Sequence, residues 1–103
     1  MSDIYFEVRT VSGIMIRTTK SHWELIAKTK HPEMEGKEEE VKRCLSQAVE
    51  IRRSSEDADV YLYYLPYKRY HICVVVRHLN GDGFIITAYL TDKIKEGVTT
   101  WKK

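Results

Sequence analysis

The stretch that most constrains the fold of this chain runs from residue 60 to residue 91. It contains three apolar runs rich in Val, Ile and Tyr, and these residue types favour β-strands. Residues 66–68 and 80–83 separate the runs and carry Pro, Gly or Asn residues that form turns. The pattern predicts a three-stranded antiparallel meander. Polar side chains interrupt the runs, and we expect any chemistry among them: Tyr64, His71, Arg77, Thr87 and Tyr89.

An N-terminal hairpin is expected before the meander. Residues 4–11 and 14–18 contain enough alternating β-branched and aromatic residues for two strands. Ser12 and Gly13 lie between them and favour a tight turn.

A first helix is expected to follow the hairpin. Ser21, with Glu24 three residues later, fits a capping box in which each side chain satisfies a free backbone amide. The helix is expected to stop near Lys30, because His31 precedes Pro32 and the α conformation is disfavoured there. Its predicted inward face consists of Trp23, Ile26 and Ala27.

A second helix has the clearest amphipathic pattern in the chain. Its predicted inward residues recur at helical spacing: Val41, Cys44, Leu45 and Ala48. Residues 38–40 are all Glu, and negative charge in the first turn complements the helix dipole.

These elements predict an α+β fold: an antiparallel sheet made of the N-terminal hairpin and the C-terminal meander, with two helices packed on one face. Residues 50–54 fit a short additional strand. Residues 91–103 are interpreted as an irregular, basic tail that Trp101 packs back onto the body.

The length and composition favour one domain. A chain of 103 residues, 43% of them hydrophobic, can bury one modest core, so we expect a single domain over residues 1–103. No segment has the pattern of a signal peptide, and no apolar run is long enough to cross a bilayer. We therefore expect a cytoplasmic protein without membrane contact. Cys44 and Cys73 lack C-x-x-C spacing and are interpreted as buried thiols.

The net charge of +2 conceals an asymmetry along the chain. Residues 1–59 carry ten Lys or Arg against twelve Asp or Glu, whereas residues 60–103 carry seven against three. A locally basic surface of this kind can bind phosphates.

The motifs of metal and nucleotide sites are missing from the sequence. The four histidines lack metal-ligand spacing, and there is no phosphate-binding loop, nucleophile elbow or dinucleotide fingerprint. We therefore expect no cofactor and no metal. Cleavage of RNA by attack of the ribose 2′-hydroxyl suits such a chain, because it needs only a base, an acid and donors to the phosphate oxygens.

His22 is the first candidate for proton transfer. If Ser21 caps the helix, His22 lies in the first turn, where the helix dipole disfavours imidazolium and free amides favour a bound anion. A neutral imidazole beside a phosphate could act as a base. The alternative, an exposed histidine at a helix start, is favoured by the spacing alone. His31, His71 and His78 are interpreted as structural or surface groups.

Arg77 and Thr87 lie on strands joined by one hairpin. Arg77 could hold a phosphate through two nitrogens, and Thr87 could donate to a phosphate oxygen. The alternatives are a surface arginine and a threonine chosen for strand propensity. A bulge would decide whether the two share a face. Tyr64 and Tyr89 are candidates for stacking on bases, although most tyrosines of the meander are expected to pack in the sheet.

Taken in order, the motifs resemble one nuclease family. They are S-H-W-E-L-I-x-x-x-K-H-P-E at residues 21–33, an acidic helix, and then V-Y-L-Y-Y, C-V-V-V-R-H, G-F-I-I-T-A-Y and D-K-I-K-E-G-x-x-x-W. Over residues 19–103 this order is similar to the phage-derived barnase-EndoU-colicin-RelE-like nuclease family.

The resemblance implies a metal-independent endoribonuclease of the prokaryotic toxin type, with RNA as substrate and a small cognate antitoxin as candidate partner. It points to four catalytic positions: His22 as base or acid, Arg77 for the phosphate charge, and Thr87 and Tyr89 for positioning. We also expect substrate contacts from Tyr64 and Lys93. The alternative is a noncatalytic module of the same fold that binds nucleic acid or protein.

Overall fold

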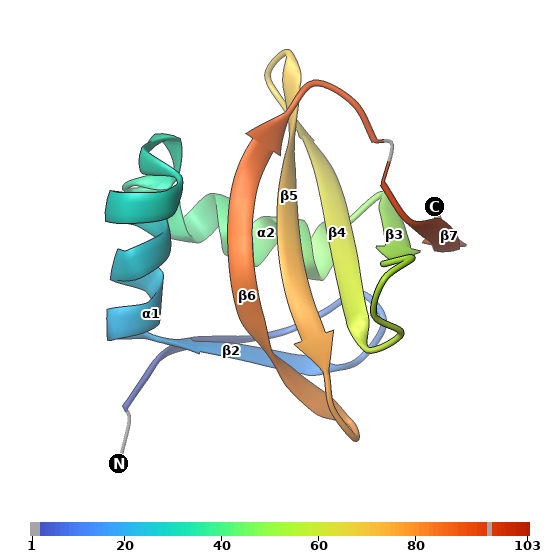
Figure 1. Ribbon diagram of the computed structural model, residues 1–103, viewed down its shortest axis with the longest axis horizontal. Helices are drawn as coiled ribbons and strands as arrows, with labels where there is room; N and C mark the ends of the chain where they lie inside the picture. The colour runs from blue at the N-terminus through green and yellow to red at the C-terminus, as the bar shows by residue number, and fades with distance from the viewer. Residues whose placement is uncertain (1–2, 95) are drawn as a thin grey trace.

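The computed structural model describes residues 3–94 and 96–103, and it confirms the α+β class (Figure 1). Two helices, two short helical turns and seven strands follow in the order β1 (Ile4–Arg9), β2 (Met15–Thr19), α1 (Lys20–Leu25), the π-helical turn η1 (Ile26–Lys30), the 3-10 turn η2 (Pro32–Met34), α2 (Glu38–Gln47), β3 (Glu50–Arg53), β4 (Val60–Tyr67), β5 (Tyr70–His78), β6 (Asp82–Thr91) and β7 (Val98–Lys102).

The seven strands of the described residues form one sheet in the order β1-β2-β6-β5-β4-β3-β7. The predicted meander is confirmed as β4, β5 and β6, and the predicted hairpin as β1 and β2. The hairpin joins the meander through parallel pairing of β2 with β6, while the other neighbours are antiparallel. The parallel contact was not expected from the sequence.

One face of the sheet carries the main hydrophobic core. In Figure 1, α2 crosses behind β4, β5 and β6, while α1 lies beside β6. Since side chains alternate along a strand, every second residue of the meander points toward α2. The segments α1, η1 and α2, with the C-cap residue of α2, contribute the inward residues predicted from their spacing. All of these are buried: Trp23, Ile26, Ala27, Val41, Cys44, Leu45 and Ala48.

The predicted start of the first helix is wrong by two residues. Thr19, not Ser21, is the N-cap: its side chain accepts a hydrogen bond from the backbone N–H of His22 at 3.2 Å. Thr19 ends β2 in an extended conformation, so its hydroxyl already points at the first helical turn. The predicted stop near Lys30 is confirmed, because the helix continues into η1 and ends there.

The irregular tail expected at residues 91–103 is also a wrong prediction. Residues 98–102 form β7, which pairs with β3 at the edge of the sheet. β3 is only four residues long, and its free edge supplies the hydrogen-bonding partners that make this segment a strand. Trp101 packs against the core, as expected.

Two smaller features complete the description. The turn expected at residues 66–68 begins later, since Pro66 and Tyr67 still belong to β4 and Lys68 takes the left-handed conformation with φ 55°. Cys44 and Cys73 are both buried and free, as predicted. Across residues 3–94 and 96–103, no helix has the length and apolar character to cross a membrane.

Candidate functional site

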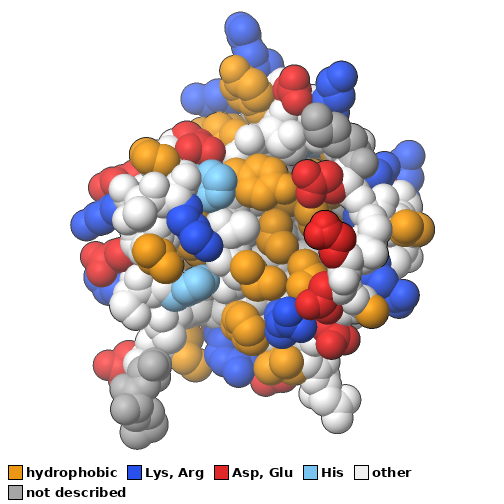
Figure 2. All heavy atoms as spheres, viewed as in Figure 1, with side chains coloured by type: hydrophobic (Ala, Val, Ile, Leu, Met, Phe, Trp, Pro, Cys, Tyr) orange, Lys and Arg blue, Asp and Glu red, His pale blue; other side chains and the backbone are white. Residues whose placement is uncertain are grey.

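The face of the sheet opposite α2 has no helix in front of it in Figure 1. A second, smaller cluster of buried residues lies here, formed by Leu62, Tyr64 and Cys73 with Val75, Tyr89 and Ile94 packed against it. Figure 2 shows this face: an apolar area over the meander, histidines on the side of α1, and acidic side chains on the side of β3. We call it the open face.

A β-bulge sets which residues of β6 reach the open face. Val75 lies opposite Thr87, but the next residue, Val76, lies opposite Ile85, so Ile86 is an extra residue in β6. Without the bulge, Thr87 would point toward α2. With it, Thr87 and Tyr89 share the open face with Val75 and Arg77. The question of whether Arg77 and Thr87 share a face, which the sequence left open, is answered by this extra residue.

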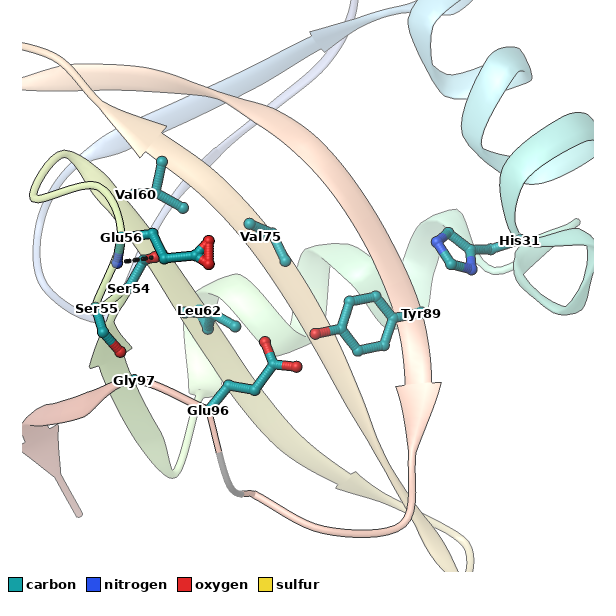
Figure 3. Close-up of a pocket in the computed structure, with 10 residues that line it drawn as sticks. All are labelled: His31, Ser54, Ser55, Glu56, Val60, Leu62, Val75, Tyr89, Glu96 and Gly97. Carbon is teal, nitrogen blue, oxygen red and sulfur yellow. Dashed lines mark hydrogen bonds between the residues drawn. The ribbon is translucent and has the colours of Figure 1, made fainter.

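A groove of about 740 Å³ lies on the open face (Figure 3). Its floor is apolar and comes from β4 and β5. His31 and Tyr89 border one side, and the loop between β3 and β4 borders the other, together with the segment before β7. The lining residues are His31, Ser54, Ser55, Glu56, Val60, Leu62, Val75, Tyr89, Glu96 and Gly97.

His31 lines this groove, although the sequence patterns did not place it in the candidate site. Its ring lies 5.5 Å from the ring of Tyr89, between centroids, and its Nδ1 lies 3.6 Å from a carboxylate oxygen of Glu33. The imidazole is one-third exposed. The available signal was the His31-Pro32 junction, which ends the first helix. That signal could not reveal which strand the ring would face.

His22 lies farther along β6, at a different hollow. Its Nε2 is 3.0 Å from the carbonyl oxygen of Ile86, the extra residue of the bulge. When Nε2 donates to that carbonyl, Nδ1 is the acceptor nitrogen of the neutral ring. The neighbouring hollow, of about 340 Å³, includes Phe84 and Arg17. His22 therefore satisfies a sheet carbonyl, and its catalytic role stays a prediction.

Arg77 lies on the open face, two residues beyond Val75 on β5, and its guanidinium is already paired. Nη2 donates to Asp57 Oδ2 at 2.8 Å, and Nη1 lies 3.8 Å from Asp59 Oδ2. The hydrogen bond from Arg77 is the main cause that lowers the pKa of Asp57 below its usual value. Arg77, which the sequence predicted to bind a phosphate, is thus paired with two carboxylates of its own chain.

Tyr89, Tyr64 and Cys73 form a cluster at the floor of the open face. Burial, with Cys73 as a neighbour, raises the pKa of both phenols well above the usual value. Burial also raises the pKa of the Cys73 thiol to about 12. The Tyr89 phenol, which borders the groove, therefore keeps its proton.

Thr87 and Lys93 complete the predicted set. The Thr87 hydroxyl oxygen is buried and has no hydrogen-bond partner among the described residues, which is uncommon for a buried polar atom. Lys93 is exposed just after β6, where its carbonyl accepts a hydrogen bond from Thr91 at 3.1 Å. Arg77, Thr87, Tyr89 and Tyr64 thus lie on one face, with His22 at its edge.

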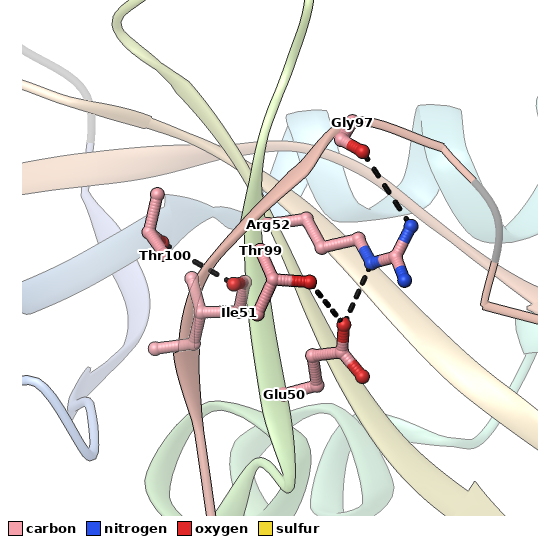
Figure 4. A network of polar contacts seen from close by, with 6 residues as sticks. All are labelled: Glu50, Ile51, Arg52, Gly97, Thr99 and Thr100. Carbon is pink, nitrogen blue, oxygen red and sulfur yellow. Dashed lines mark hydrogen bonds and ion pairs between the residues drawn. The ribbon is translucent and has the colours of Figure 1, made fainter.

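A polar network joins β3 to the backbone at Gly97 (Figure 4), the residue that follows Glu96 in the groove lining. Arg52 Nε donates to Glu50 at 2.7 Å, Thr99 donates to the same carboxylate oxygen at 2.7 Å, and Arg52 Nη1 reaches the carbonyl of Gly97 at 3.5 Å. Burial alone would raise the pKa of Glu50, but the hydrogen bonds from Thr99 and Arg52 outweigh it and lower that pKa. Nothing in the sequence pattern indicated this network.

Within the described ranges, no three His, Cys, Asp or Glu side chains gather as a ligand set for a metal ion. The arrangement offers side-chain chemistry instead: an imidazole and two carboxylates for proton transfer, and a protonated phenol as a donor. Comparison with models of known protein families, with curated proteins and with solved structures returned no match to this chain. The nuclease-family resemblance therefore stays a prediction from the sequence motifs.

Proposed function

We propose that the chain is a metal-independent endoribonuclease whose active site is the groove on the open face. The observation that carries the proposal is the meeting of His31, Tyr89, Glu56 and Glu96 around one hollow of about 740 Å³. A cavity of this size is in the range that accepts a small organic group such as a nucleotide. The motif resemblance supports the same activity.

In this mechanism the ribose 2′-oxygen attacks the adjacent phosphorus and the bond to the 5′-oxygen breaks. The products are a 2′,3′-cyclic phosphate and a free 5′-hydroxyl. One group must take the 2′-hydroxyl proton and another must protonate the leaving oxygen. His31 and Glu96, on opposite sides of the groove in Figure 3, form the proton-transfer pair. The Tyr89 phenol donates to a phosphate oxygen, whose negative charge grows during the reaction.

This assignment moves the leading histidine from His22 to His31. The reason is position: His31 borders the groove and lies against Tyr89, whereas the Nε2 of His22 is engaged with the Ile86 carbonyl. Thr87, which pairs with Val75 of the groove lining, remains a candidate donor. We further propose that the enzyme acts in the cytoplasm and is a toxin held in check by an antitoxin. The toxin role rests on the motif resemblance alone.

The test is cleavage of a mixed-sequence RNA by the purified chain in the presence of EDTA. The proposal predicts 2′,3′-cyclic phosphate ends and a loss of at least about 100-fold for His31→Ala, the scale of general acid-base catalysis. His22→Ala is the matched control, since it removes an imidazole from the same helical region and leaves the groove intact. Loss of cleavage in His22→Ala but not in His31→Ala, with both variants still folded, would return the assignment to His22.

A noncatalytic binding module is the second candidate, and one observation favours it. The loop at residues 54–59 and the segment before β7 place acidic side chains beside the apolar floor, and Arg77 is neutralised. Such a surface attracts a basic protein segment. RNA that remains intact with wild-type protein under every ionic condition tried would favour this candidate over the nuclease.

A further inference from the structure

The acidic loop between β3 and β4 has a second role beside lining the groove. Ser54, Ser55 and Glu56 form one wall of the groove, and the next residues of the loop hold Arg77. One loop therefore contacts both the proposed catalytic groove and the arginine predicted to bind phosphate.

The two carboxylates that pair with Arg77 are arranged as the oxygens of a bound anion would be. A guanidinium presents its two terminal nitrogens side by side, a spacing that matches two oxygens of a phosphate. Here Nη2 faces Asp57 at 2.8 Å and Nη1 faces Asp59 at 3.8 Å. The two carboxylates thus take the positions that two phosphate oxygens would take.

The contact can open without unfolding the protein. The side chains of Arg77 and Asp57 are 34% and 42% exposed, so both reach solvent. An exposed ion pair of this kind contributes little to stability and is weakened by salt. By contrast, the backbone of Asp59 is fixed, since its carbonyl accepts a hydrogen bond from the His78 N–H at 2.8 Å.

From this geometry we infer that Asp57 and Asp59 form an internal anion that competes with the phosphates of a nucleic acid for Arg77. The inference rests on the proposed function for its substrate, and it adds regulation of the same site. In the resting protein the arginine is occupied. A phosphate bound beside the groove displaces Asp57, and the guanidinium then contributes to binding.

The direct test is the affinity of Asp57→Asn for a fluorescent single-stranded oligodeoxynucleotide, measured by anisotropy at low salt. This probe lacks the 2′-hydroxyl and cannot be cleaved, so binding is read without catalysis. The substitution is conservative in geometry. Asp57 Oδ1 accepts from the Asp59 N–H at 3.0 Å and asparagine keeps that acceptor, while the oxygen facing Arg77 becomes an N–H₂ group.

The expected result is an affinity about threefold higher than that of the wild type, the scale of one exposed ion pair. Arg77→Ala binds more weakly than the wild type, and the double variant Asp57→Asn/Arg77→Ala shows no gain over Arg77→Ala. Glu39→Gln is the control for net charge, because Glu39 pairs with Lys42 on α2. It leaves the affinity near the wild-type value.

Two results would overturn the inference: unchanged affinity in Asp57→Asn, or a gain that persists in the double variant. Cleavage of RNA is measured separately on the same proteins. If the gain in affinity appears while no variant cleaves RNA, the competition for Arg77 stands and the nuclease proposal fails. If RNA is cleaved but Asp57→Asn behaves as the wild type, the reverse conclusion holds.

Discussion

The two faces of the central sheet are built from the same three strands, but they use different residue types. Toward α2 the strands present apolar side chains that are completely buried, such as Val74, Val76 and Ile85. Toward the open face the same strands present Arg77, Thr87 and Tyr89 among the apolar residues. One face therefore holds the fold together, whereas the other is free to carry polar groups that contribute little to stability.

Gly97→Ala should have the largest effect, because Gly97 lines the groove of the open face and its backbone lies against β3. Gly97 has φ +81°, and an added Cβ would collide with the carbonyl oxygen of Arg53. We expect the free energy of unfolding to fall by about 3 kcal/mol, which is at the upper end of the cost of backbone strain. Hydrogen exchange should accelerate in β7 and β3 while α2 keeps its protection.

Gly13→Ala is the matched control for that experiment. Gly13 has φ +88° but nothing lies within 4 Å of its added Cβ, so the substitution isolates the backbone strain from the collision. Equal destabilisation by both variants would show that the close approach of β7 to β3 is unimportant.

The difference between the two faces can be tested by making the same change, valine to threonine, at two adjacent positions of β5: Val74→Thr and Val75→Thr. Val74 is fully buried toward α2, so its new hydroxyl has no water and costs about 2 kcal/mol. Val75 borders the groove, where a hydroxyl meets solvent, and its change stays within about 0.5 kcal/mol. Urea denaturation measures both. A similar cost at the two positions would contradict the division into faces.

Thr87→Val should separate stability from activity. The hydroxyl has no partner among the described residues, so its removal should stabilise the fold by about 1 kcal/mol. Loss of the donor should lower RNA cleavage. The control is Thr10→Val: Thr10 is also buried, but its hydroxyl accepts from the Ile14 N–H at 3.2 Å, so this change should destabilise. Destabilisation by Thr87→Val would show that the Thr87 hydroxyl makes a hydrogen bond, and the expected difference from Thr10→Val would then be absent.

The smallest predicted effect concerns pH. Burial lowers the pKa of His78, which donates to or accepts from Tyr63 at 3.0 Å. The folded state then binds this proton less readily than the unfolded state, whose pKa is about 6.5. The contribution to stability is complete above that pH and is lost as the pH falls through the lower pKa of the folded state. Wild type should therefore lose slightly more stability than His78→Gln between about pH 8 and about pH 5. Parallel curves would contradict this.

Local patterns predicted the elements that lie in the main core. The spacing of Val41, Cys44 and Leu45 predicted α2, and the alternating apolar runs predicted the meander, because burial of a periodic face leaves a periodic sequence. β7 was missed for the opposite reason: residues 98–102 become a strand by pairing with the short β3, a contact distant in the sequence.

The candidate site was harder to predict than the fold. Arg77, Thr87 and Tyr89 were recognised by residue type, but their common face depends on the bulge at Ile86, which leaves no local signal. His31 was overlooked because its position depends on how η1 and η2 direct the chain back over β6. Asp57 and Asp59 looked like ordinary loop residues, since their partner lies on another strand.

The central claim is that the open face is the surface that binds nucleic acid. Its most direct test is a titration of the isotope-labelled chain with an uncleavable oligodeoxynucleotide, followed by amide chemical shifts. We predict the largest changes at His31, Tyr89 and Val75 around the groove, with α2 unaffected. Changes confined to α2 or to the β1 edge, or no binding at low salt, would contradict the account.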